Sequence, residues 1–125
     1  MSTTYQPGVC NIGPAEIRSR QRAGIGGAIV TVVALVAMVV FAIPDGWRWL
    51  IALPAGVAAM GFLQAAFHFC ARFGMAGLFN FGEVGREEAV YEAEYRRADQ
   101  RKAALISALS LGIGVVVAVI AVLLP

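Results

Sequence analysis

The chain alternates between long apolar stretches and shorter polar segments, and this alternation is its dominant pattern. Three stretches without a charged residue cover residues 23–43, 49–70 and 103–125. As helices with a rise of about 1.5 Å per residue, each would be roughly 32–35 Å long, which matches a bilayer hydrocarbon core of about 30 Å. A soluble domain of 125 residues has no core large enough to hide three helices that are apolar on all sides. The pattern predicts an all-α integral membrane protein with three transmembrane helices.

The first helix carries a start signal well before its apolar stretch. Residues 1–13 show no apolar period, which predicts a flexible N-terminal segment. Gly13 can serve as the N-cap, Pro14 is preset for the first helical position, and Glu16 in the first turn meets the positive end of the helix dipole. Glu16 can also pair with Arg20 one turn later. The first helix is therefore expected to begin near Pro14 and to run to the end of the first apolar stretch.

A polar segment, residues 71–102, joins the second and third apolar stretches. Its first part is apolar and rich in glycine, and is expected to lie at the membrane interface or to extend the second helix. From Glu83 onward acidic residues come first and basic residues follow, an order that complements a helix dipole. This order predicts a charged, amphipathic cytoplasmic helix that runs directly into the third transmembrane helix. One face of this cytoplasmic helix would carry Val84, Tyr91, Tyr95 and Ala98. That face either packs on the apolar first part of the segment or docks a partner.

The composition agrees with a membrane protein and argues against one class of function, nucleic-acid binding. Hydrophobic residues make up 59% of the chain and charged residues 14%, against about 45–50% and 25% in soluble domains. The net charge of +2 is small, and no basic cluster is interleaved with aromatic residues, which argues against nucleic-acid binding. No linker or repeat divides the sequence, so residues 1–125 are expected to form a single membrane unit.

Basic residues flank the apolar stretches unequally. Arg48 lies in the short loop between the first two stretches. The other basic residues precede the first stretch or lie between the second and third: Arg18, Arg20, Arg22, Arg72, Arg86, Arg96, Arg97, Arg101 and Lys102. Lys and Arg accumulate in cytoplasmic loops. The N-terminus and the long loop are therefore expected in the cytoplasm, and the first loop and the C-terminus outside.

One group of polar residues lies within or next to an apolar stretch. Gln64, His68 and Arg72 recur every four residues and would form a stripe on the second helix. In a structural interpretation Gln64 bonds to Ser107 or Ser110 of the third helix, while the other two reach lipid headgroups. In a functional interpretation the stripe forms a binding groove for a lipid headgroup or a small polar ligand, because polar groups are costly against lipid tails.

Two cysteines suggest a further possibility. Cys10, His68 and Cys70 could together hold zinc or copper(I), and His68 alone could be an axial ligand of haem. Positions 68 and 70 lie about 200° apart around a helix, so their side chains converge only if the helix unwinds. We therefore predict no metal and no cofactor, and expect both cysteines to be reduced and to act as small hydrophobic residues.

Small residues recur at four-residue spacing on all three predicted helices. Such faces let helix backbones approach closely, within one chain or between subunits. The candidate packing residues are Gly24, Gly56, Gly61, Ser110, Gly114 and Ala118. Three helices offer few internal interfaces, so some of these faces are expected to contact a second copy or another membrane subunit.

The sequence contains no phosphate-binding loop, zinc-binding helix motif or recognisable nucleophile, and the predicted protein is not an enzyme. Residues 10–18, together with residues 61–64, resemble stretches of small uncharacterised multi-pass bacterial membrane proteins. That resemblance implies a bacterial membrane location and no activity. The sequence is interpreted first as an accessory or assembly subunit of a membrane complex. The alternative is a lipid- or ligand-binding protein that uses Gln64, His68 and Arg72.

Overall fold

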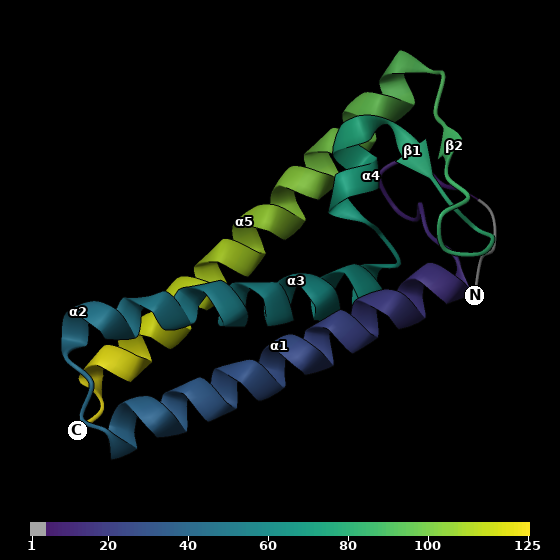
Figure 1. Cartoon of the computed structure of the whole chain (residues 1–125). Helices are drawn as coiled ribbons and strands as arrows, with labels where there is room; N and C mark the ends of the chain where they lie inside the picture. Colours follow the sequence, from purple (N-terminus) through teal and green to yellow (C-terminus); the bar gives the residue numbers. More distant parts are fainter. Residues whose placement is uncertain (1–4) are drawn as a thin grey trace.

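The structure is a computed structural model that describes residues 5–125, and it is mostly helical. Three helices are long and apolar enough to cross a membrane. The first is α1 (Pro14–Val40) and the last is α5 (Ala93–Leu123). The second is built from three consecutive segments, α2 (Asp45–Arg48), the 3-10 helix η1 (Trp49–Ile51) and α3 (Ala52–Phe67). The prediction of a mostly helical chain with three membrane-length helices is confirmed, although a short pair of strands departs from the all-α expectation (Figure 1).

Local signals explain where these helices begin and end. α1 begins at Pro14, as predicted, with Gly13 as an extended N-cap and Glu16 in its first turn. α1 ends before the apolar stretch does, and Ala42 follows in the left-handed region with a φ of 50°. Pro54 lies in the first turn of α3, directly after η1. The proline therefore lies where the 3-10 segment passes into α3, within a helical span that runs from Asp45 to Phe67.

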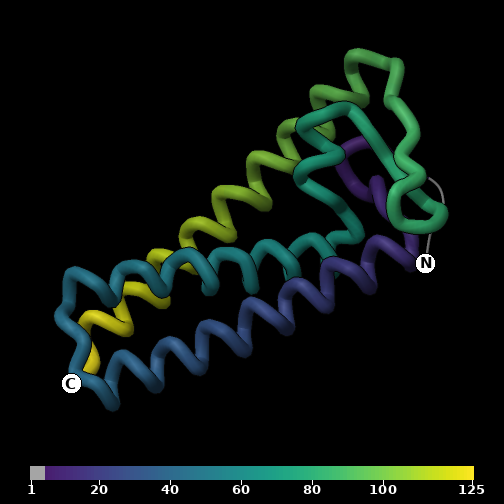
Figure 2. Tube along the Cα trace, viewed as in Figure 1, coloured from purple at the N-terminus to yellow at the C-terminus, as the bar shows by residue number. Residues whose placement is uncertain are grey.

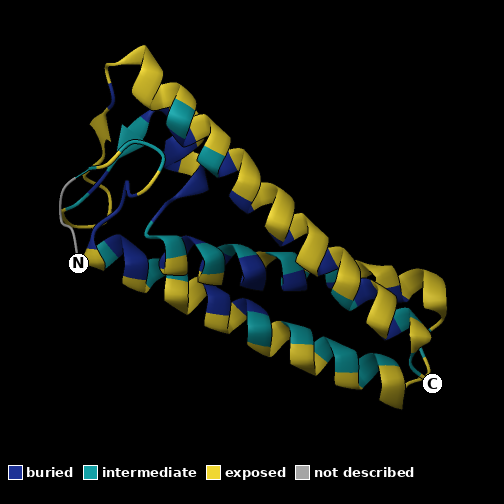
Figure 3. Ribbon diagram, turned by 180° about the vertical axis from the view of Figure 1, so that it is seen from behind, coloured by how far each residue is buried: buried dark blue, intermediate teal, exposed yellow. Residues whose placement is uncertain are grey.

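The helix α3 lies between α1 and α5 and packs against both (Figures 1 and 2). The buried residues of α5 form one seam at three- or four-residue spacing: Asp99, Ala103, Ile106, Ser110, Gly114, Ala118 and Ala121. The helix α1 is covered least, since only 11% of the residues in its most apolar stretch are buried, against 39% in the second span. Figure 3 shows the exposed outer faces of α1 and α5, which are left to lipid or to other helices.

The small residues singled out in the sequence lie at the contacts between helices of this chain. Gly61 packs so closely on α1 that a Cβ there would lie 2.5 Å from the backbone nitrogen of Gly24. A Cβ at Gly24 would in turn lie 2.9 Å from the ring of Phe62. On the other side of α3, a Cβ at Gly114 would lie 2.8 Å from the carbonyl oxygen of Ala52. These faces are thus used inside the three-helix unit.

The same seam takes in the remaining predicted packing residues. Ser110 and Ala118 are buried on α5, and Gly56 of α3 faces the backbone of Ser110, with a Cβ-to-oxygen distance of 3.8 Å. The Ser110 hydroxyl donates to the carbonyl oxygen of Ile106 at 2.8 Å. The hydroxyl is therefore satisfied within its own helix and is not paired with Gln64.

A compact polar body lies at the end of the bundle where α1 begins and α3 ends, opposite the C-terminus (Figures 1 and 2). We call it the head and define it as residues 5–13 and 68–92. It contains α4 (Ala71–Ala76) and an antiparallel pair of short strands, β1 (Leu78–Phe79) and β2 (Glu88–Ala89). The N-terminal segment joins this pair through a parallel bridge between Ile12 and Asn80.

The head differs from the sequence-based expectation in two ways. The predicted helix from Glu83 onward begins only at Ala93, because residues 78–92 form the two strands and their connection. Val84 and Tyr91 therefore do not share a helix face with Tyr95 and Ala98. From Ala93 on, the prediction of a charged helix continuous with the third span agrees with α5.

The second difference concerns the N-terminal segment. The sequence predicts flexibility for residues 1–13, whereas Cys10, Asn11 and Ile12 are among the most buried residues of the structure. The segment packs on Ala65, Cys70 and Phe73 instead of remaining free in solvent. The first four residues of the predicted flexible segment lie outside the described residues.

Candidate functional site

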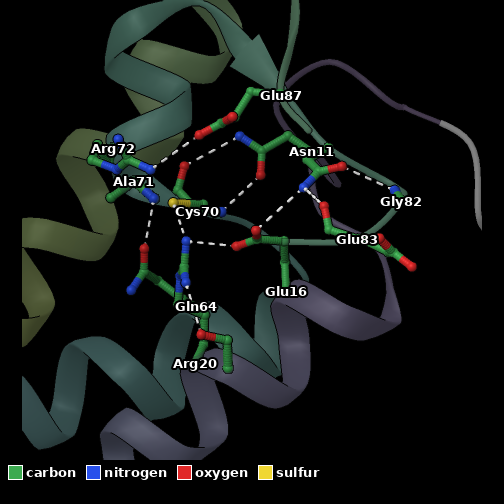
Figure 4. A network of polar contacts seen from close by, with 12 residues as sticks. Asn11, Glu16, Arg20, Gln64, Cys70, Ala71, Arg72, Gly82, Glu83 and Glu87 are labelled. Atoms are coloured by element: carbon green, nitrogen blue, oxygen red, sulfur yellow. Dashed lines mark hydrogen bonds and ion pairs between the residues drawn. The ribbon is translucent and has the colours of Figure 1, made fainter. Parts of the chain in front are cut away.

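The candidate site is a network of polar side chains where the head joins the bundle (Figure 4). Its first member, Asn11, is fully buried. The Asn11 Nδ2 donates to the Cys70 carbonyl oxygen at 3.2 Å, and Asn11 Oδ1 accepts from the Cys70 backbone N–H at 2.7 Å. The Asn11 backbone N–H also donates to the His68 carbonyl oxygen at 3.1 Å. Asn11 thereby supplies hydrogen-bond partners to the backbone groups of the segment between α3 and α4. Buried backbone groups without partners would be costly there.

A buried ion pair continues the network on α1. Arg20 Nη2 lies 2.9 Å from Glu16 Oε2, which is the predicted pair one turn apart. The same Arg20 nitrogen donates to Cys70 Sγ at 3.1 Å. Asn80 Nδ2 donates to Glu16 Oε1 at 3.2 Å and to the Glu83 carbonyl oxygen at 2.7 Å. The Glu16 carboxylate is thus bound by Arg20 at one oxygen and by Asn80 at the other. A buried charge needs such partners, because leaving it unpaired is costly.

The predicted stripe of Gln64, His68 and Arg72 does not run along one helix. The helix α3 ends at Phe67, and His68 takes a left-handed conformation with a φ of 54° as its C-cap. Gln64 is buried and its Oε1 accepts from the Ala71 backbone N–H at 2.8 Å. Arg72 belongs to α4 and lies 3.6 Å from Glu87 Oε1. The helix break takes His68 out of the helical spacing that would have aligned it with Gln64 and Arg72.

The structure nevertheless brings Gln64 and Arg72 to one place. Both line a hollow of about 350 Å³, together with Arg20 and Cys70. The two guanidinium groups also lie against the ring of Phe73, at 5.8 Å for Arg20 and 4.9 Å for Arg72. His68 does not line this hollow. The hollow thus gathers two basic groups and an amide, and each guanidinium group is paired with a carboxylate, Arg20 with Glu16 and Arg72 with Glu87.

The cysteines occupy separate positions in the network. Cys10 and Cys70 are both buried and unpaired as thiols. The Cys10 thiol donates to the Ile12 carbonyl oxygen, and burial raises the pKa of this thiol above its ordinary value. Among residues 5–125 no group of three or more His, Cys, Asp or Glu side chains could hold a metal ion. The set of Cys10, His68 and Cys70 considered from the sequence is therefore not assembled as a metal site.

Asp99 is a buried acid within the charged run that the sequence predicts to form a cytoplasmic helix. It accepts the Tyr5 hydroxyl at 2.5 Å and the Gly8 backbone N–H at 2.8 Å. Burial, and then the hydrogen bond to Asp99, raise the pKa of the Tyr5 hydroxyl above its ordinary value, so that the hydroxyl stays a donor at neutral pH. Asp99 thus ties the N-terminal segment to α5. The sequence carries no signal for this contact. Asp99 lies among other acidic and basic residues, and residues in such a segment are usually exposed to solvent.

Arg48 has an equally specific role at the other end of the bundle. It is buried, and its guanidinium donates to the carbonyl oxygens of Ile43 at 2.8 Å and of Ala121 and Leu124, both at 2.9 Å. The Ala121 carbonyl lies in the last turn of α5, and the carbonyls of Leu124 and Ile43 lie just beyond the C-terminal ends of α5 and α1, which carry partial negative charge. The sequence signal for this role is a single basic residue in a short loop between two helix ends.

Comparison of the chain with protein-family models, with curated proteins and with solved structures finds no match. The candidate functions therefore rest on the geometry described above.

We expect the variant Asn11→Ala to be less stable by about 1–3 kcal/mol, because it leaves the buried Cys70 N–H without an acceptor and removes one of the two donors to the Cys70 carbonyl oxygen. Thermal unfolding in detergent micelles measures this effect. Gln100→Ala, which removes an exposed amide from α5, is the control and should unfold like the wild type. Equal stability of the wild type and Asn11→Ala would show that the N-terminal segment is not held as described.

Proposed function

We propose that this chain is a non-catalytic accessory or assembly subunit of a membrane complex, with its head presented to a partner on the cytoplasmic side. The observation that carries the proposal is the construction of the head. Segments distant in sequence are joined there through buried side chains such as Asn11 and Asp99. Every buried side-chain nitrogen and oxygen of the described residues has a hydrogen-bond partner. A fixed polar body beside a membrane bundle suits a docking role.

The membrane-spanning helices add a second support. Large apolar side chains remain exposed along α1, including Val32, Val33 and Val36. Within the chain, α1 packs through Gly24 and Gly27 and, nearer its C-terminal end, through Leu35 and Met38. The exposed α1 surface suits contact with lipid and with helices of another membrane subunit or of a second copy. Bacterial origin and the cytoplasmic membrane remain part of the proposal, and rest on the resemblance of residues 10–18.

The test of this function is gentle extraction from native membranes, followed by identification of the chains that stay bound. A protein partner recovered in fixed proportion to the chain is the expected result. Recovery of the chain alone from membranes, under conditions that keep other complexes intact, would contradict the proposal.

The proposed orientation places the head inside and the α1–α2 turn outside, in line with the asymmetry of basic residues. The native thiols cannot report this orientation, because Cys10 and Cys70 are buried. We expect a membrane-impermeant maleimide to label Gly46→Cys in intact cells and to label Tyr91→Cys only after the membrane is opened. Both positions are exposed. The wild type is the control for background labelling, and the reverse pattern would show the opposite orientation.

A second candidate function is binding of an anionic lipid headgroup in the hollow between Arg20 and Arg72. The lining of that hollow favours it, and native mass spectrometry in the presence of phosphatidylglycerol tests it. Arg72→Gln should lower the amount of bound lipid, whereas His68→Phe should not, because His68 lies outside the hollow. Equal lipid binding by the wild type and Arg72→Gln would eliminate this candidate.

A further inference from the structure

A groove of about 700 Å³ runs over the outer side of the head, next to the start of α5. Its lining comes from the N-terminal segment, from β1, and from the chain between β2 and the first turn of α5. Four of its lining residues are aromatic: Tyr5, Phe79, Tyr91 and Tyr95. Among residues 5–125, the groove shares no lining residue with the hollow between Arg20 and Arg72, and it is connected to that hollow through the ion pair of Glu87 with Arg72.

The aromatic side chains form a connected surface with one fixed member. The rings of Tyr5 and Phe79 are stacked with centroids 4.9 Å apart, and the rings of Tyr5 and Tyr95 lie 6.3 Å apart. Tyr5 is held in place because its hydroxyl donates to buried Asp99. Tyr91, in contrast, is 86% exposed. An aromatic face that is both fixed and open to solvent offers a π surface to a cation.

The charges along the groove have one sign. Its ionisable lining residues, besides the tyrosines, are the glutamates Glu87, Glu88 and Glu92. Glu87 lies 3.6 Å from Arg72 of α4 and is therefore partly neutralised. Glu88 and Glu92 are exposed and, within the described part of the chain, take part in no ion pair. The neighbouring Arg96 is turned to the backbone, where it donates to the Val90 carbonyl oxygen at 3.3 Å.

We propose that this groove binds a lysine- or arginine-rich peptide segment of a partner protein. Carboxylates attract the charges of such a segment, and the tyrosine rings hold its cationic side chains by cation–π contacts. The groove is open and extends over several residues, which suits a peptide better than a single small cation. An anionic lipid surface would be repelled by Glu88 and Glu92.

The chemical class of partner follows from the proposed function, on which this inference rests. Membrane proteins carry most of their Lys and Arg in the cytoplasmic segments next to their transmembrane helices. A head at the cytoplasmic membrane face lies at the same distance from the bilayer as these basic segments of other membrane proteins, so the two can come into contact. A basic juxtamembrane segment of another membrane protein is therefore the occupant.

The test uses the full chain in nanodiscs of zwitterionic lipid and a fluorescent hexalysine peptide as the probe. The expected result is saturable binding by fluorescence anisotropy that weakens with salt. The double variant Glu88→Gln/Glu92→Gln should bind at least about tenfold more weakly, which corresponds to about 1.4 kcal/mol. The control, Glu83→Gln/Glu94→Gln, removes two exposed charges from positions outside the groove and should bind like the wild type within about twofold.

Three results would overturn the proposal. One is equal binding of hexalysine by the wild type and the groove variant. Another is equal binding of a hexaglutamate peptide, which would show that the contact does not depend on charge sign. The third is a photoreactive hexalysine that cross-links only outside the groove, which is lined by Tyr5, Phe79 and residues between positions 87 and 95. Circular dichroism of each variant checks that loss of binding does not reflect loss of fold, and Tyr95→Leu gives an independent test of the aromatic contribution.

Failure of this inference can be distinguished from failure of the proposed function. A partner that co-purifies equally with the wild type and with Glu88→Gln/Glu92→Gln overturns the groove assignment and leaves the accessory function standing. Hexalysine binding that depends on Glu88 and Glu92 supports the groove even where no partner is recovered from membranes. In that case the accessory function fails and the site remains.

Discussion

The variant Gly61→Leu should destabilise the protein by about 3 kcal/mol or more, because the site cannot accommodate a side chain. A Cβ at this position would lie 2.5 Å from the backbone nitrogen of Gly24 and 2.7 Å from the carbonyl oxygen of Arg20. Both atoms belong to the backbone of α1, so the contact can be relieved only if the two helices separate. Thermal unfolding in detergent, followed by the loss of helical signal, measures the effect.

The matched control for this change is Gly26→Leu. Gly26 belongs to α1, and a Cβ there would find nothing within 4 Å. Its substitution adds the same bulk to a surface that faces away from the other helices, so stability should change by less than about 0.5 kcal/mol. Similar stability of the two variants would mean that α1 and α3 do not approach each other as closely as described.

Arg48→Met should have an effect of similar size, about 3 kcal/mol or more, at the opposite end of the bundle. The methionine keeps much of the side-chain volume, but several buried carbonyls near the ends of α1 and α5 lose their donor. Lysine can place only one compact ammonium group there, so Arg48→Lys should recover part of the loss. Arg86→Met, at an exposed position of the head, is the control and should be close to neutral. A neutral Arg48→Met would show that this guanidinium does not join the helix ends.

The three long helices could be predicted from the sequence because each depends on local properties. Length and apolarity define the spans, and the Gly13–Pro14–Glu16 signal defines the start of α1. The exact end of α3 could not be predicted in the same way. His68 takes a left-handed conformation there, which a sequence marks most clearly when the residue is glycine. The helical spacing of Gln64, His68 and Arg72 therefore suggested a stripe that the helix break removes.

The structure of the head could not be predicted from the sequence, for a different reason. Its stability comes from pairs far apart in the chain, such as Asn11 with Cys70 and Tyr5 with Asp99. Each of these polar residues alone has the pattern of a solvated position, and only the fold brings them together. The groove has the same origin, since Tyr5 meets Tyr95 only once the N-terminal segment has packed on α5. The acidic and aromatic residues were visible in the sequence, but their joint surface was not.

The central claim, that the head docks a protein partner, is tested most directly by photo-cross-linking in living cells of the native host. The photoreactive residue p-benzoylphenylalanine replaces Tyr91 in the groove or Val33 on the exposed face of α1. We predict that the residue at position 91 forms an adduct with another protein, and that the Glu88→Gln/Glu92→Gln background reduces this adduct several-fold. The account would be contradicted if position 91 formed no protein adduct while position 33 reacted with lipid, because the head would then face solvent without a partner.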